Sequence, residues 1–60
     1  MSKNSGYLVI TKTGKKGRTY HSEDPINDKI KVHVMTDDFE LTGDKLLCSP
    51  EGLTKIGFID

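Results

Sequence analysis

The densest group of chemically active side chains lies near the start of the chain, within a segment that we call the basic hairpin (residues 12–18). Its basic members flank two glycines and are Lys12, Lys15, Lys16 and Arg18. Tyr20 follows, and cationic groups beside an aromatic ring are suited to contact a phosphate and to stack on a base. The alternative is an ordinary solvated turn, because lysine side chains are mostly exposed. Nucleic-acid contact through the basic hairpin is therefore one hypothesis.

A second candidate group consists of His21 and His33. If the loop between them centres near Ile26, an antiparallel register places residue 20 opposite residue 32 and residue 21 opposite residue 31. The two histidines are then diagonal neighbours on the outer face of the sheet. A structural zinc site takes four ligands, and the chain lacks the usual Cys and His spacings. We therefore expect two exposed polar residues and no metal site.

The other reactive side chains do not combine into a recognisable site. The acidic run from Asp37 to Asp44 lacks the regular oxygen ligands of a calcium loop, which favours a solubilising loop or a contact for a basic partner. Cys48 has no basic neighbour in the sequence and is predicted to be a small buried hydrophobe. Because the chain has no nucleophile elbow, phosphate-binding loop or oriented Cys-His pair, we predict a protein that is not an enzyme and uses no cofactor.

Short strands and turns must position these residues. Tyr7–Thr11 is β-branched and aromatic, which favours a strand. Gly14 and Gly17 bracket two lysines and permit a tight turn that presents both ammonium groups at its tip. Residues 18–22 are again extended, and the polar segment that follows predicts a loop in which Ile26 packs beneath its own turn.

The second half of the chain continues this pattern. Residues 29–34 alternate polar and aliphatic side chains, which predicts a half-buried strand with Lys31 and His33 facing water. Residues 35–38 predict a turn, residues 39–42 resume the alternation, Gly43-Asp44 predicts a further turn, and residues 45–48 and 56–59 predict short strands. Between those two strands, residues 49–53 predict a helical or 3₁₀ turn with Ser49 as its N-cap. The predicted core consists of Leu8, Ile10, Tyr20, Ile30, Val32, Val34, Phe39, Leu41, Leu47, Leu53, Ile56 and Phe58.

Composition and charge limit the class of protein. The chain has 60 residues, of which 33% are hydrophobic, so we expect one small domain over residues 1–60. The first 18 residues carry five basic side chains and no acidic one, for a charge of +5, and the remaining residues sum to −5. This division predicts an electrically two-sided molecule of zero net charge.

The cellular setting follows from the same composition. A lone cysteine fits a reducing compartment, and no apolar run approaches the roughly 20 residues that span a bilayer. The first residues lead directly into a strand without the apolar core of a signal peptide. We therefore expect a complete, soluble, cytoplasmic protein that does not contact a membrane.

The number and spacing of the strands predict the fold class. Five or six short strands within one small chain favour an all-β fold, since only a layer that closes or packs on itself can bury their apolar faces. We expect a small five- to six-stranded antiparallel barrel with one short 3₁₀ turn before the last strand.

Two stretches of the chain resemble a known family. Residues 14–21, followed by a polar loop and by residues 30–34, resemble the KOW motif of some small Src-homology-3-like (SH3-like) barrels. The single turn at residues 49–53 before a final Ile-Gly-Phe strand is similar to the 3₁₀ turn that such barrels place before their last strand. The resemblance implies an SH3-like barrel that binds RNA, DNA or protein through its loops and one barrel face.

Two functions of different classes remain open. In the first, which we favour, a non-catalytic adaptor or regulator docks on a protein partner, because a neutral chain has little long-range attraction to a polyanion while its charge division orients a specific approach. Self-association is a special case of this function. In the second, the basic hairpin contacts nucleic acid, as the KOW resemblance implies. The candidate binding residues are Lys12, Lys15, Lys16, Arg18, Tyr20, His21 and His33.

Overall fold

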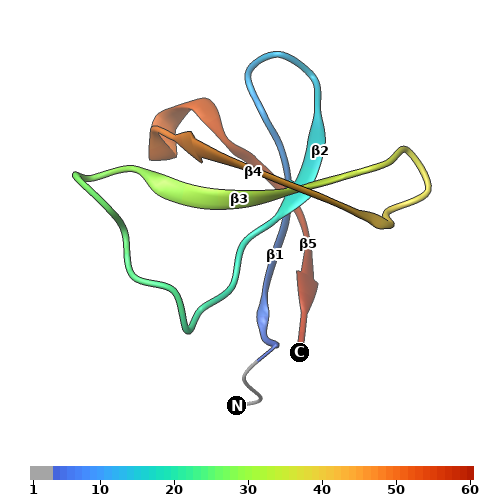
Figure 1. Cartoon of the computed structure of the whole chain (residues 1–60), viewed down its shortest axis with the longest axis horizontal. Helices are drawn as coiled ribbons and strands as arrows, with labels where there is room; N and C mark the ends of the chain where they lie inside the picture. Colours follow the sequence, from blue (N-terminus) through green and yellow to red (C-terminus); the bar gives the residue numbers. More distant parts are fainter. Residues whose placement is uncertain (1–3) are drawn as a thin grey trace.

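The computed structural model describes residues 4–60 and contains five strands and one 3₁₀ turn within them (Figure 1). In chain order the elements are β1 (Gly6–Ile10), β2 (Lys16–Arg18), β3 (Ile30–Met35), β4 (Leu41–Cys48), the 3₁₀ turn η1 (Pro50–Gly52) and β5 (Thr54–Ile59). The described part of the chain has no α-helix. The predicted antiparallel all-β fold, with one 3₁₀ turn before the last strand, is confirmed.

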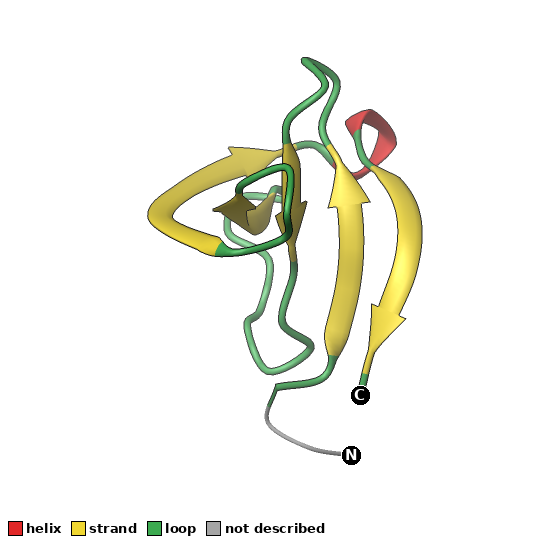
Figure 2. Cartoon of the chain, turned by 90° about the vertical axis from the view of Figure 1, so that its right-hand side faces the viewer, coloured by secondary structure: helices red, strands yellow, loops and turns green. Residues whose placement is uncertain are grey.

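The strands form one open sheet with the order β4-β3-β2-β1-β5, and every neighbouring pair is antiparallel. The sheet is strongly coiled, because β3 and β4 run across the direction of β1 and β5 (Figure 1). Figure 2 shows β1 and β5 side by side, with a strongly bent β4 on the other side of the molecule. Because β4 and β5 do not pair with each other, both are edge strands.

The β1–β2 connection differs from the predicted turn. Thr11 N–H donates to the Lys15 carbonyl (2.8 Å), and Gly14 adopts a φ of 89°. Gly17 lies in β2 instead, where an added Cβ would come within 2.4 Å of Val32 Cγ1. Gly17 is therefore needed for close packing against β3, and Lys16 lies in a strand and not at the tip of the turn.

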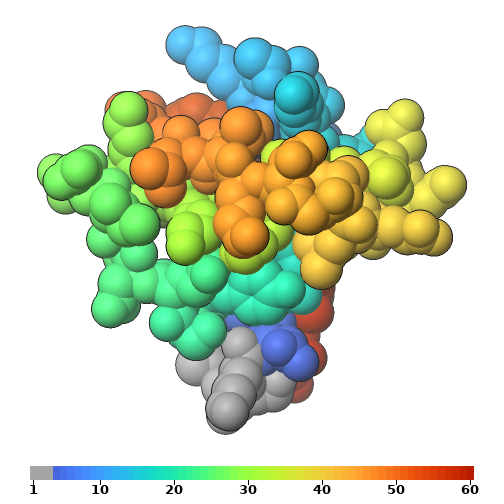
Figure 3. Space-filling view, viewed as in Figure 1, coloured from blue at the N-terminus to red at the C-terminus, as the bar shows by residue number. Residues whose placement is uncertain are grey.

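The β2–β3 connection ends in a two-residue turn. Ile26 and Lys29 exchange two backbone hydrogen bonds of 2.9 Å around Asn27 and Asp28, which both adopt positive φ (51° and 63°). Asn and Asp tolerate this left-handed conformation, so the sequence fits a type I′ turn. Ile26 is 45% exposed, and the prediction that it packs beneath its own turn is wrong. In the space-filling view this hairpin and the β1–β2 and β3–β4 hairpins project from the body in three directions (Figure 3).

β4 is one continuous strand where the sequence predicted two. Gly43-Asp44 does not form a turn, because both residues lie inside β4, with Gly43 at a φ of 92°. The β3–β4 register shifts opposite this point, between His33 and Met35. This irregularity in the ladder accommodates the left-handed conformation of Gly43. Such an irregularity is a common reason for a glycine inside a strand.

The β3–β4 turn follows β3 directly, where Thr36 N–H donates to the Glu40 carbonyl (2.8 Å). The turn predicted at residues 35–38 is therefore confirmed, and its bend lies at residues 37–39. Phe39 adopts a φ of 61° within it and is 39% exposed, and Leu41 is 55% exposed. The prediction that Phe39 and Leu41 face a core is therefore wrong.

The core is smaller than predicted and partly on the opposite face. Val9 (1% exposed) and Val32 (0%) are the only buried hydrophobic residues in the described chain, and Val9 was not among the predicted core residues. Leu8 and Ile10, the residues of β1 that were predicted for the core, are half-buried. Three further predicted core residues are exposed, namely Leu47 (49%), Ile56 (44%) and Phe58 (55%).

The 3₁₀ turn confirms the predicted element, and Ser49 occupies its N-cap position as predicted. Pro50 occupies the first position, where the missing N–H costs no hydrogen bond. The Ser49 side chain makes no capping hydrogen bond, and its main-chain carbonyl accepts from Gly52 N–H (2.9 Å) instead. Leu53 N–H then donates to the Pro50 carbonyl (3.1 Å) before β5 begins.

Candidate functional site

The basic hairpin does not present its four charges together. Lys12 and Lys15 lie exposed around the β1–β2 turn. Lys16 forms an ion pair with Asp37 (Nζ–Oδ1 3.1 Å), and its ammonium lies 5.8 Å from the centre of the Phe39 ring. These contacts direct Lys16 toward the β3–β4 turn and away from the other hairpin lysines.

Arg18 lies in the interior and not on a basic tip. It is 7% exposed, and its guanidinium carbon lies 3.9 Å from the centre of the Tyr20 ring. Its Nε donates to the Thr19 carbonyl (3.3 Å) and its Nη2 to the Asn4 carbonyl. Because a guanidinium stacks on aromatic faces and donates in a fixed plane, these contacts hold residues before β1 against the end of β2.

His33 lies beside this arginine because the β2–β3 register differs by one residue from the predicted one, with Arg18 directly opposite His33. His33 Nε2 donates to Glu23 Oε1 (2.7 Å), and its ring centre lies 4.7 Å from that of Tyr20. The His33 side chain is only 15% exposed, so the prediction that it faces water is wrong. We call Arg18, Tyr20, Glu23 and His33 the arginine cluster.

His21 belongs to a different group, which we call the aromatic cluster (Tyr7, His21 and Phe58). Its ring centre lies 5.0 Å from that of Tyr7 and 5.7 Å from that of Phe58, and the Tyr7 and Phe58 centres are 5.6 Å apart. The Lys55 ammonium lies 4.2 Å from the centre of the Tyr7 ring. His21 and His33 therefore have separate surroundings, and residues 4–60 contain no group of three His, Cys, Asp or Glu side chains placed to hold a metal ion.

A β-bulge in β5 explains why Lys55 and Phe58 meet the same tyrosine. Phe58 pairs with Tyr7 and Lys55 with Val9, which leaves Ile56 as the extra residue. In a regular strand two residues three positions apart point to opposite faces, whereas the bulge brings these two to one face. Sequence reasoning missed both residues as site members, and Gly57 was the only local signal of an irregular strand.

The two edge strands carry most of the large apolar side chains that the molecule exposes. Leu41 (55%) and Leu47 (49%) lie on β4, and Ile56 (44%) and Phe58 (55%) lie on β5. An edge strand also presents main-chain N–H and C=O groups that no neighbouring strand satisfies. Apolar area and free hydrogen-bonding groups therefore coincide on both edges of the sheet.

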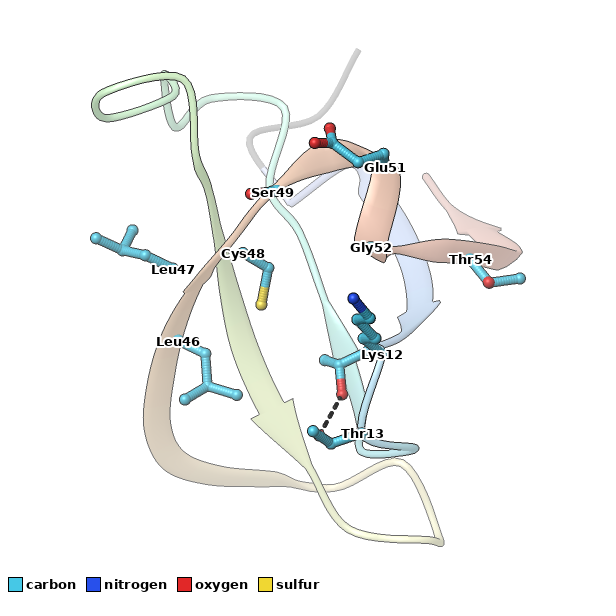
Figure 4. Close-up of a pocket in the computed structure, with 10 residues that line it drawn as sticks. Lys12, Thr13, Leu46, Leu47, Cys48, Ser49, Glu51, Gly52 and Thr54 are labelled. Carbon is cyan, nitrogen blue, oxygen red and sulfur yellow. Dashed lines mark hydrogen bonds between the residues drawn. The ribbon is translucent and has the colours of Figure 1, made fainter.

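A cleft of about 710 Å³ opens between the β1–β2 turn, the end of β4 and η1 (Figure 4). Leu46 and Cys48 extend into the space between these elements, whereas Leu47 points away from it. Lys12 and Glu51 contribute opposite charges to its lining. Cys48 is half-buried and not fully buried as predicted. A second cleft of about 380 Å³ lies between the aromatic cluster, the β2–β3 loop and η1.

No helix in the described part of the chain is long and apolar enough to cross a membrane. No family model, curated protein or solved structure matches the chain. The candidate site therefore consists of two open apolar edges, an aromatic cluster beside one of them, and the arginine cluster, in which Arg18 is buried.

Proposed function

We propose that this protein is a non-catalytic binding module that docks on a protein partner through the apolar side chains of its edge strands. One observation carries the proposal. Six large hydrophobic side chains are 39% to 55% exposed, while two hydrophobic residues of the described chain are buried. Large aromatic and aliphatic side chains of this kind supply the central contacts of protein interfaces.

The charge distribution supports the same proposal. The chain has no net charge, so a polyanion exerts little long-range attraction on it. A division into a basic first part and an acidic remainder still orients the approach of one protein to another. The unpaired, half-buried Cys48 fits a protein of the reducing cytoplasm.

We further propose that the fold is an SH3-like barrel that stays open between β4 and β5. The meander of β1 to β4, the return of β5 to the side of β1, and the position of η1 between the last two strands support this proposal. The open side matters for function, because a barrel that closed there would satisfy the edges that we assign to the partner.

Nucleic-acid binding through the basic hairpin is the second candidate function. It is favoured by Lys12 and Lys15, which are exposed and form no ion pair within residues 4–60. It is weakened by Lys16 and Arg18, because both are held by groups of the same chain. Two uncommitted lysines supply a shallow salt dependence, whereas a protein with many phosphate contacts loses affinity steeply as salt rises.

The test is capture of partners from a cell lysate with matched variants. The edge variant replaces Leu47 and Phe58 by Ser, and the hairpin variant replaces Lys12 and Lys15 by Glu. We expect a nuclease-resistant protein that is retained by the wild type and the hairpin variant and lost by the edge variant. Nuclease-sensitive material that only the hairpin variant loses would establish the second candidate and contradict the first.

A further inference from the structure

The main chain of β5 shows what kind of ligand its free edge accepts. The Tyr7 carbonyl accepts from Thr19 N–H (2.9 Å), and Tyr7 N–H donates to Thr19 Oγ1 (3.1 Å), so the Tyr7 main chain faces β2. The main-chain N–H and C=O groups of successive residues point to alternate sides of a strand, so those of Gly6 and Leu8 face β5. Gly6 and Leu8 pair with Ile59 and Gly57, so the main-chain groups of these two β5 residues face β1. Phe58 lies between them, and its N–H and C=O therefore face away from the sheet.

The side chains of β5 leave this edge accessible. Edge strands commonly carry charges that prevent pairing with other chains. β4 has two charged residues, Asp44 and Lys45, whereas β5 has only Lys55, and its ammonium is held over the Tyr7 ring. The exposed Phe58 side chain and its outward main-chain groups are therefore open to a ligand in extended conformation.

Lys55 indicates the charge of that ligand. Its ammonium forms no ion pair within residues 4–60, and the bulge places it on the same face as Phe58. It lies over the Tyr7 ring, and an aromatic ring attracts a cation without neutralising it. A carboxylate on an added strand is thus complementary to the one charged side chain of this edge.

We propose that β5 binds an extended, acidic segment of a partner protein, which adds to the sheet as a sixth strand. The added strand pairs with the main chain of Phe58 and places a carboxylate beside Lys55. Because the bulge leaves Lys55 and Phe58 opposite Val9 and Tyr7, they span two positions of the ladder. A strand rises about 3.3 Å per residue, so the carboxylate lies about 7 Å along the added strand from the residue opposite Phe58. This inference rests on the proposed protein-docking function and names the edge and the chemistry of the partner.

The test selects binders from a displayed library of random short peptides against three forms of the whole chain: wild type, Lys55→Glu and Lys45→Glu. The two variants carry the same charge change on opposite edges of the sheet. We expect wild type and Lys45→Glu to enrich β-branched peptides with an acidic residue, and Lys55→Glu to enrich basic ones. The acidic peptides should bind Lys55→Glu about tenfold more weakly or worse.

A second measurement isolates the main chain. Chemical synthesis of the chain with an N-methyl group on Phe58 keeps the side chain and blocks the outward N–H, and the same group on Thr13, in the exposed β1–β2 turn, is the control. We expect the Phe58 derivative to lose the selected peptides and the Thr13 derivative to retain them, with circular dichroism spectra unchanged. Equal binding by both derivatives would overturn the proposal.

Three further outcomes would also overturn it: no enriched peptide, the same peptides enriched by Lys55→Glu and wild type, or a dimer that depends on Phe58, because the occupant would then be a second copy. The lysate capture is repeated with the edge variant divided into Leu47→Ser and Phe58→Ser. A lysate partner that is lost by Leu47→Ser but kept by Phe58→Ser would overturn the β5 assignment and leave the protein-docking function intact. Loss of the partner from both single variants, with no peptide selected, would refute only the strand-addition mode.

Discussion

The arginine cluster and the β5 edge distribute polar and apolar groups in opposite ways. Arg18 is 7% exposed, and its partners are a tyrosine ring and main-chain carbonyls. On β5, Ile56 and Phe58 are 44% and 55% exposed. A cationic side chain is thus inside the protein while large apolar side chains are outside, which reverses the usual arrangement.

This contrast separates the residues that hold the fold from those that are free to bind. Burying a guanidinium is tolerated only when its hydrogen bonds are satisfied, and then its loss leaves other buried polar groups without partners. An apolar side chain that stays exposed contributes little to folding, because it gains little from leaving water. The arginine cluster should therefore govern stability, and the β5 edge should govern binding.

The largest expected effect on stability comes from the strand that joins the two regions. A Cβ at Gly6 would lie 1.8 Å from the Thr19 carbonyl oxygen, a main-chain atom that cannot move aside cheaply. We predict that Gly6→Ala lowers the free energy of unfolding in urea by about 3 kcal/mol or more. On β5, the Cβ of Gly57→Ala would contact the flexible Leu8 side chain, with its Cδ1 nearest at 3.2 Å, and the change should cost about 1 kcal/mol or less. Equal losses in the two variants would contradict the contrast.

A replacement of Arg18 tests the arginine cluster directly. Arg18→Met keeps much of the side-chain volume but removes the donors to the Asn4 and Thr19 carbonyls and the cation over Tyr20. We predict a loss of about 2 to 3 kcal/mol in urea unfolding. Lys55→Met is the matched control on β5 and should change stability by less than about 0.5 kcal/mol. A smaller loss for Arg18→Met than for its control would show that the buried guanidinium does not stabilise the fold.

A smaller effect is expected from the apolar core. Val32 is completely buried, so Val32→Ala should lower stability by about 2 kcal/mol through lost burial and a residual cavity. Leu47→Ala removes a larger side chain that is 49% exposed and should cost about 1 kcal/mol or less. Thermal unfolding of the two variants measures both losses. A larger loss for Leu47→Ala than for Val32→Ala would contradict this account, because Leu47 would then belong to the core.

The smallest expected effects concern two ion pairs of different burial. The Glu23 carboxylate contacts His33 Nε2 (2.7 Å) and Lys31 Nζ (3.9 Å), and the Glu23 side chain is one third exposed. Glu23→Gln should lower the free energy of unfolding by about 1 kcal/mol. Asp37 is 97% exposed although it pairs with Lys16 at 3.1 Å, so Asp37→Asn should leave the urea midpoint unchanged. A measurable loss for Asp37→Asn alone would reverse this ranking of the pairs.

The sequence predicted the strands better than their faces. Val9 lies in a continuous apolar run, Leu8-Val9-Ile10, and such a run carries no alternation that shows which residue points inward. The Leu46-Leu47 pair is ambiguous for the same reason, and the half-buried member is Leu46. By contrast, β3 alternates clearly, and its central residue Val32 was placed correctly.

The candidate site was less predictable, because it depends on register and on one bulge. A shift of one residue between β2 and β3 moved His33 from an outer position to a place opposite Arg18. The burial of Arg18 contradicts the general exposure of arginine and requires the Tyr20 ring beside it. Lys55 and Phe58 share a face only through the bulge at Ile56, which no sequence pattern indicated apart from the adjacent Gly57.

The most direct test compares folding and binding in Phe58→Ala, with Leu41→Ala as a control of equal exposure on the other edge. The urea midpoint and the affinity for the protein or peptide that wild type selects are measured for both variants. We predict unchanged midpoints in both, with affinity lost by about tenfold or more in Phe58→Ala and retained in Leu41→Ala. A Phe58→Ala variant that is destabilised by about 2 kcal/mol or more, or that binds like wild type, would contradict the assignment of β5 to binding.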